Sequence, residues 1–296
     1  MIASLPPTLA VLYSELVLSL YPILIKTVNT NIYTQILARF MVFPALALAF
    51  GPFSDFLKTW GTPDGAFSGI LLNILNIEHI LASYTSFKSL PVGSAISLFY
   101  LYPIFNVIAG ALLFGESLSL FSIIVIGIAF IGMYLIATSQ EKTLIESAAS
   151  DTKKHNYGVI MGILAAITET IIFVFIRSNV NAQASPYYTV NHLYPAGLVI
   201  LLLYGIFNTK SIVDTNAISW TKLIGFNALL GFTGYLSRFY AIPKISTIIF
   251  SLLSFFGVAF GYIWGILFTG DKPTIKAIIG GGLIATSAAL LRYFST

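Results

Sequence analysis

The chain of 296 residues contains no cysteine, so disulfide bonds and thiolate metal sites are excluded. Charged residues make up only 9% of it, against roughly 25% in a typical soluble domain. The formal net charge of +4 is scattered through connecting segments without a dense basic run, which argues against nucleic acid as a partner. No His/Glu group has metal-ligand spacing and no nucleophile–base pair is visible. We therefore expect no cofactor, no metal ion and no enzymatic activity.

What the sequence has in abundance is apolar surface. Hydrophobic residues make up 57% of the chain, more than a soluble fold of this length can bury, so we expect a multi-pass integral membrane protein in a lipid bilayer. A spanning helix needs about 20 mostly apolar residues, and each such stretch should be helical because lipid offers no partner for an unpaired backbone group. The ten stretches that qualify are 8–28, 32–50, 67–88, 92–114, 118–138, 157–178, 186–207, 220–242, 245–268 and 274–294.

The second half of the chain repeats the first at an offset of 155 residues. Gly110, Leu112, Gly115, Glu116 and Gly127 return as Gly265, Leu267, Gly270, Asp271 and Gly282. The polar segment 139–156 predicts a solvated linker between a first unit, 1–138, and a second, 157–296. Five spans per unit would place the units in opposite orientations. The sequence thus predicts an all-α membrane protein of ten transmembrane helices, built as two inverted five-helix repeats.

Part of this pattern resembles a known family. The run LPVGSAISLFYLYP at 90–103, the Gly-Glu turn that begins at Gly115, and Gly127 resemble the second half of an EamA domain. In tandem, that domain builds the drug/metabolite transporter superfamily. The second copy departs from the pattern, since Val258 replaces the proline and Asp271 the glutamate of the first copy. The resemblance implies a transporter gated by spans three–four and eight–nine, whose substrate could be an amino acid, nucleotide sugar, sugar phosphate, drug or vitamin.

Charged residues inside the spans are the main candidates for a substrate site, because each costs about 2.5–3.5 kcal/mol at mid-bilayer. Glu15 and Glu169 lie 154 residues apart, within one residue of the repeat offset. In an inverted repeat they would face each other across a central cavity and take a proton or a substrate amine. The alternative is a packing role, in which each carboxylate pairs with Arg39 or accepts hydrogen bonds from Ser and Tyr.

Three more residues complete the set of substrate-binding candidates. Arg39, the only arginine predicted near the middle of a span, needs an anion, either on the substrate or on a protein Glu. Glu78 is near mid-span, but its neighbour His79 points about 100° away on a helix, so both cannot face one site. His192, three residues before Pro195, is either a hydrogen-bonded packing residue or a proton relay.

Prolines and glycines suggest how the helices bend and pack. Pro22, Pro44, Pro103 and Pro195 lie within spans one, two, four and seven, where each can bend its helix. Gly257, Gly261 and Gly265 form a Gly-x-x-x-Gly ridge that lets another helix come close. Packing within the bundle and formation of a homodimer are both open.

The function predicted from the sequence is secondary transport of a small polar, possibly amino-acid-like metabolite by alternating access. One alternative is a nucleotide-sugar or sugar-phosphate exchanger, favoured if Arg39 faces the cavity beside further basic groups. The other is a non-transporting membrane protein that binds a partner through the glycine ridge.

Overall fold

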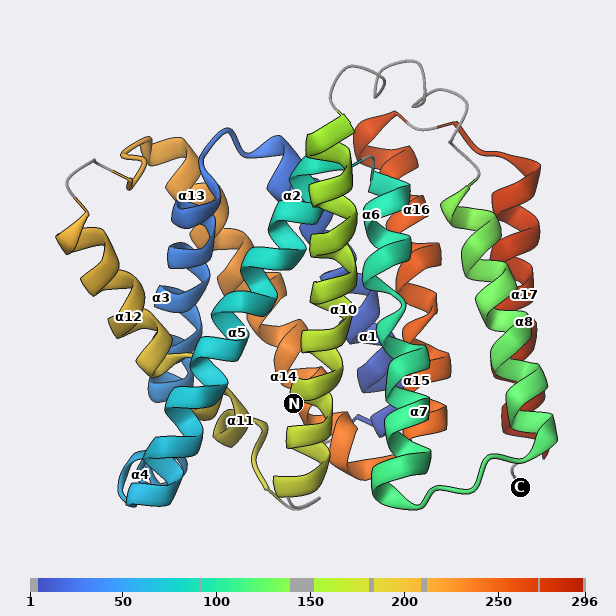
Figure 1. Ribbon diagram of the computed structural model, residues 1–296, viewed down its shortest axis with the longest axis horizontal. Helices are drawn as coiled ribbons and strands as arrows, with labels where there is room; N and C mark the ends of the chain where they lie inside the picture. The colour runs from blue at the N-terminus through green and yellow to red at the C-terminus, as the bar shows by residue number, and fades with distance from the viewer. Residues whose placement is uncertain are drawn as a thin grey trace.

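The structure is a computed structural model of the whole chain, and it describes residues 5–90, 92–138, 152–180, 184–208, 212–270 and 272–294. The described chain is a bundle of helices (Figure 1). Most of the predicted linker, 139–151, lies outside the described residues, and α10 begins inside its predicted end. The helices of the first half are α1 (Pro7–Leu18), α2 (Tyr21–Thr27), α3 (Ile32–Phe50), α4 (Phe53–Trp60), α5 (Pro63–Ser89), α6 (Val92–Phe99), α7 (Tyr102–Phe114) and α8 (Leu120–Ala137).

The second half contains α10 (Thr152–Asn179), α11 (Pro186–Leu193), α12 (Pro195–Phe207), α13 (Ala217–Phe226), α14 (Phe232–Ala241), α15 (Thr247–Ser254), α16 (Phe256–Thr269) and α17 (Ile275–Phe294). A π-helical turn, Asn227–Gly231, joins α13 to α14. It interrupts the eighth predicted span.

Eight described segments are helices long and apolar enough to cross a membrane. They are Pro7–Thr27, Ile32–Phe50, Pro63–Ser89, Ser94–Phe114, Leu120–Ala137, Lys153–Asn179, Pro186–Phe207 and Thr247–Phe268. The tenth predicted span contains a shorter apolar helix, Ile275–Leu290. An all-helical membrane bundle is thus observed, whereas the count of ten spans stays a prediction.

The distribution of side chains is that of a membrane protein. Large apolar side chains point outward, with Phe207 80% and Ile275 77% exposed, whereas Glu15, Asn73 and Asn106 are fully buried. A bilayer favours this arrangement because it solvates apolar side chains and leaves polar groups to find partners inside the bundle.

Besides the eighth, four of the predicted spans are broken near their middle. Breaks before Pro22, Pro103 and Pro195 separate α1 from α2, α6 from α7, and α11 from α12. Each proline lacks the N–H that would continue the helical hydrogen bonds. Pro44, by contrast, lies inside the continuous helix α3. The fourth break separates α15 from α16 at Phe255, 155 residues after Tyr100, although no proline is present there.

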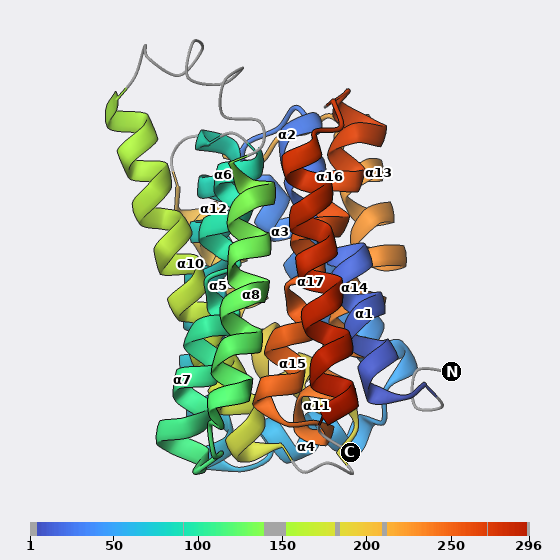
Figure 2. The ribbon, with the colours of Figure 1, turned by 90° about the vertical axis from the view of Figure 1, so that its right-hand side faces the viewer.

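Equivalent helices of the two halves make equivalent contacts. Helix α1 packs on α14, and α10 packs on α5. Helix α7 packs on α15, and α8 lies beside α17 along one side of the bundle (Figures 1 and 2). The turns after α7 and α16 also match, because Gly115 and Gly270 both have left-handed backbones, with φ of 63° and 76°. This conformation is strained for a residue with a Cβ, which explains the glycine in both copies.

Candidate functional site

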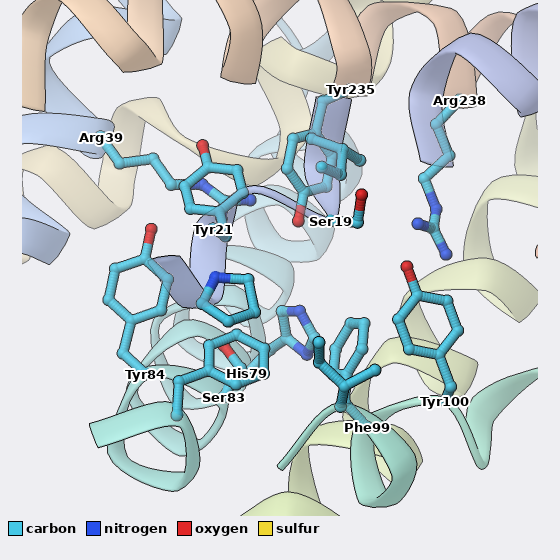
Figure 3. Close-up of a pocket in the computed structure, with 14 residues that line it drawn as sticks. Ser19, Tyr21, Arg39, His79, Ser83, Tyr84, Phe99, Tyr100, Tyr235 and Arg238 are labelled. Carbon is cyan, nitrogen blue, oxygen red and sulfur yellow. The ribbon is translucent and has the colours of Figure 1, made fainter. Parts of the chain in front are cut away.

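A cavity that is partly open to its surroundings, with about 470 Å³ of empty space including that opening, lies among α2, α3, α5, α6 and α14. Figure 3 shows its polar and aromatic lining. The lining consists of Leu18, Ser19, Tyr21, Pro22, Arg39, His79, Ser83, Tyr84, Phe87, Ile96, Phe99, Tyr100, Tyr235 and Arg238. These residues come from the α1–α2 and α6–α7 breaks and from α2, α3, α5, α6 and α14, so the broken helices bring them together.

Arg238 links the two glutamates that the sequence placed at equivalent positions. Its Nη2 lies 2.8 Å from Glu169 Oε1, and its Nη1 lies 3.4 Å from Glu15 Oε1. All three side chains are almost fully buried. Glu15 also accepts hydrogen bonds from Tyr100 at 2.8 Å and Tyr102 at 3.1 Å. One guanidinium therefore holds the carboxylates of both halves in the low-dielectric interior.

His79 extends this network on the side of Glu169. Its Nε2 lies 3.1 Å from Glu169 Oε2, and its Nδ1 lies 3.2 Å from the Ala165 carbonyl and 3.1 Å from the Thr168 hydroxyl. With a neutral imidazole, the two carboxylates and Arg238 sum to a charge of −1. One proton, on the imidazole or on a carboxylate, would make the network neutral.

Arg39 has different surroundings. Its Nη2 and Nε donate to the Tyr194 hydroxyl at 2.7 and 3.2 Å. The guanidinium carbon lies 4.2 Å from the ring centroid of Tyr235 and 5.1 Å from that of Tyr21, and Phe43 lies at 5.2 Å. Among the described residues, no carboxylate lies within 4 Å of it. Of the two anions considered for Arg39, a protein glutamate is not observed.

The other two candidates lie elsewhere. Glu78 is half-buried on α5, is not part of the cavity lining, and makes no ion pair with a described residue. His192 is buried outside the cavity, where its Nδ1 lies 2.8 Å from the Thr59 hydroxyl and 3.2 Å from the Tyr188 carbonyl. The turn of about 100° between neighbouring helical residues explains why His79 faces the cavity and Glu78 does not.

Comparison with known proteins identifies the family. The sequence profile of the EamA-like transporter family matches residues 5–138 and 156–293. The chain belongs to this family. It is 25% identical, over 207 residues, to an "Uncharacterized transporter YxxF" of Bacillus subtilis (strain 168); the match covers 70% of the chain but only 63% of that relative. A solved crystal structure, 15% identical, shares the fold with a TM-score of 0.74 and coverage of 96% of this chain and 97% of the other.

The Gly-Glu turn of the EamA-like chain lies at the end of the bundle opposite α2 and α6 (Figure 1). Glu116 accepts hydrogen bonds from the backbone N–H and the hydroxyl of Thr247, at 3.0 and 2.8 Å, where α15 begins. It also forms a 2.7 Å ion pair with Arg177, whose Nη1 donates to the Ile242 carbonyl. A carboxylate is favoured at a helix N-terminus by the unpaired N–H groups there. Its predicted counterpart, Asp271, lies outside the described residues.

The glycine ridge of the EamA-like bundle faces inward. A Cβ at Gly257 would collide with the Tyr100 hydroxyl and come within 2.6 Å of Glu15 Oε2, and one at Gly261 would meet Ile96 at 2.8 Å. The ridge therefore lets α16 pack closely against α1 and α6.

Arg238 is the site residue that the sequence did not reveal. It falls near the end of the eighth apolar stretch, where a charge is usually assigned to the membrane surface, yet it is only 3% exposed. Helical spacing offers a signal: Asn227, Gly231, Tyr235 and Arg238 follow one another at three or four residues and are all buried. A stripe of small and polar residues within an apolar helix marks a face turned to the protein interior.

Proposed function

We propose that this protein is a secondary transporter that moves a small polar metabolite by alternating access between two inverted five-helix halves, 1–138 and 157–296. The observation that carries the proposal is the buried network in which Arg238 binds Glu15 of the first half and Glu169 of the second. Ionisable groups inside a membrane bundle are costly and mark transport or proton pathways. The network borders a cavity, as expected for a substrate site between repeats.

The arrangement of the helices supports the inverted repeat. Replacing each helix by its counterpart one repeat offset away converts the α1–α14 pair into the α10–α5 pair, and both pairs pack closely. In Figure 1, α1 runs from the end of the bundle near the termini towards the end with α2, whereas α10 runs the opposite way. Equivalent helices with opposite directions are what a two-fold axis in the membrane plane produces. With α13–α14 and α17 as the eighth and tenth spans, the bundle would have ten.

The two ends of the bundle support alternating access, because they differ. The cavity extends towards Phe87 and Ile96, near α2 and α6. The opposite end is held by Glu116 of the first half, which caps α15 and pairs with Arg177 of the second. Opening this contact while the other end closes would expose the site to the second side of the membrane.

The shared arginine suggests how coupling could work. Glu15 faces Arg238, Tyr100 and Tyr102, and Glu169 faces Arg238 and His79. Protonation of one carboxylate would leave Arg238 paired only with the carboxylate of the other half. Proton binding and the relative position of the halves are therefore linked. We therefore propose the proton as the coupling ion, which deepens the prediction of a carboxylate pair that takes a proton.

Two alternatives fit the site less well. A nucleotide-sugar or sugar-phosphate exchanger needs several free basic groups, but the only other arginine in the described lining, Arg238, is bound by two carboxylates. Partner binding through the glycine ridge would need an outward ridge, whereas Gly257 and Gly261 contact residues of the same bundle.

The test is uptake and efflux in proteoliposomes against a panel of amino acids, organic acids, sugars and sugar phosphates, with and without a pH gradient. We expect at least one compound to exchange, and the gradient to change its rate. Liposomes with the variant Glu15→Gln/Glu169→Gln/Arg238→Gln, which removes all three charges together, serve as the matched control. A folded wild-type protein that moves no compound above this control would overturn the proposal.

A further inference from the structure

We propose that the transported compound is a small carboxylate with an apolar body, and that Arg39 and Tyr84 bind its carboxylate group. This inference rests on the proposed transport function and names the substrate class of the same cavity. Its starting point is a cation in the cavity wall that no described carboxylate reaches.

The Arg39 guanidinium has hydrogen-bond donors available for an anion. A guanidinium has five N–H donors. The Tyr194 hydroxyl accepts hydrogen bonds from the single donor of Nε and from one of the two donors of Nη2. The two donors of Nη1 make no hydrogen bond of standard geometry with a described residue, and the Tyr84 side chain lies near the guanidinium. The net charge of −1 on the glutamate network offsets Arg39 overall, but no oxygen of that network lies within 4 Å of it. A guanidinium edge binds a carboxylate with two parallel hydrogen bonds.

Tyr84 provides a second and independent observation. Its side chain is 2% exposed and lines the same cavity. Its hydroxyl makes no hydrogen bond of standard geometry with a described residue, although the side chains of Arg39 and Tyr21 lie close enough to interact with it. The Tyr84 ring lies 6.0 Å from the ring of Tyr21, which itself stacks on the Arg39 guanidinium. Figure 3 shows Tyr84 and Arg39 on the same wall of the cavity. A buried hydroxyl without a well-formed hydrogen bond is costly. An anion oxygen between Tyr84 and Arg39 would supply that hydrogen bond.

The rest of the lining determines the charge and the body of the ligand. The described lining contains one other arginine, Arg238, which pairs with Glu15 and Glu169. His79 contacts Glu169. One free guanidinium suits a monoanion better than a phosphate dianion, which needs more positive charge. The apolar part of the lining is Leu18, Pro22, Phe87, Ile96 and Phe99. It suits a hydrocarbon or aromatic body.

The experiment compares acids with their own amides, which have nearly the same shape but no anionic charge. Purified protein is titrated calorimetrically with phenylacetate and phenylacetamide, benzoate and benzamide, and 4-methylpentanoate and its amide. Phenyl phosphate tests the phosphate alternative. Transport of the same compounds is followed in proteoliposomes. We expect at least one acid to bind and to be transported, with its amide and the phosphate at least about 30-fold weaker.

Variants locate the binding group. Arg39→Gln should weaken acid binding by about 30-fold or more and leave amide binding unchanged. Arg39→Lys keeps the charge but loses the fork, so intermediate binding is expected. Tyr84→Phe, which removes one hydroxyl and keeps the ring, should weaken acid binding by about tenfold. Lys58→Gln and Tyr134→Phe make the same chemical changes at side chains away from the cavity, and should bind acids like the wild type.

The outcomes separate this inference from the proposed function. Amides that bind as tightly as their acids, or acid binding that survives both Arg39→Gln and Tyr84→Phe, would overturn the substrate class while transport of another compound still stands. A panel in which no acid binds the folded protein also overturns it. Transport of no compound of any class overturns the proposed function itself.

Discussion

Arg39 and Tyr194 lie one repeat offset apart, 155 residues, and they hydrogen-bond to each other, with 2.7 Å between Arg39 Nη2 and the Tyr194 hydroxyl. In the proposed inverted repeat, two equivalent positions can touch only close to the axis that would relate the two halves. The two copies therefore differ at this contact, where one carries a cation and the other the phenol that holds it. This asymmetry gives the cavity one arginine, Arg39, that no described carboxylate reaches. The helices around the cavity are nevertheless paired alike.

The first prediction concerns the shared arginine. Arg238→Gln leaves the buried carboxylates of Glu15 and Glu169 without their cation, which should cost about 3–5 kcal/mol of stability. We expect a large loss of folded yield and a lower unfolding temperature in detergent. Adding Glu15→Gln and Glu169→Gln should restore folding but not transport. An Arg238→Gln protein as stable as the wild type would contradict the network's structural role.

The second prediction concerns proton coupling. Glu169→Gln removes the charge between Arg238 and His79 but keeps the shape of the side chain. Transport should lose most of its response to a pH gradient while expression stays intact, because the side-chain amide of glutamine does not bind or release a proton at physiological pH. Glu15→Gln should act alike. The measurement is the uptake rate with and without the gradient, and full, pH-dependent transport by the double variant would remove both residues from the mechanism.

The third prediction concerns the closed end. Glu116→Gln removes the charge that caps α15 and pairs with Arg177, so the contact should weaken by about 1–3 kcal/mol. Because the chain contains no cysteine, Ser254→Cys introduces a single thiol on α15, at a fully buried position. Its rate of maleimide labelling should rise in the Glu116→Gln background. With Lys58→Gln, the same thiol should react as slowly as before, and an equal rate in both backgrounds would show that the contact does not restrain α15.

The fourth prediction concerns the glycine ridge. Gly257→Ala places a methyl group against the Tyr100 hydroxyl and Glu15. It should displace the Tyr100–Glu15 hydrogen bond and reduce transport strongly. Gly281→Ala is the control, because a Cβ there meets nothing within 4 Å, and alanine should stabilise α17 by up to about 1 kcal/mol. Transport and unfolding temperature of the two variants measure this, and a fully active Gly257→Ala protein would show that the close approach is dispensable.

The sequence predicted part of the candidate site. The spacing of Glu15 and Glu169 placed both carboxylates at equivalent depths, and both lie on the same arginine. His192 was selected for its place in a span, but helical phase directs it towards Thr59 and away from the cavity. Arg238 was passed over because four residues separate it from the predicted end of its span. Depth along one helix can be read from sequence, whereas the direction in which a side chain points depends on the helices packed around it.

The sequence by itself determined the solvent and the helical architecture, because continuous apolar stretches of about 20 residues with few charges satisfy their backbone in lipid by forming helices. It also located the glycines of the turns after α7 and α16 and three of the four breaks, since proline and glycine act locally. The fourth break, at Phe255, has no proline to mark it in the sequence. Only the tertiary structure decided which charges meet. Arg39 lies among aromatic rings and Arg238 between two glutamates, because residues far apart in the sequence close around each guanidinium, and no local pattern encodes that choice.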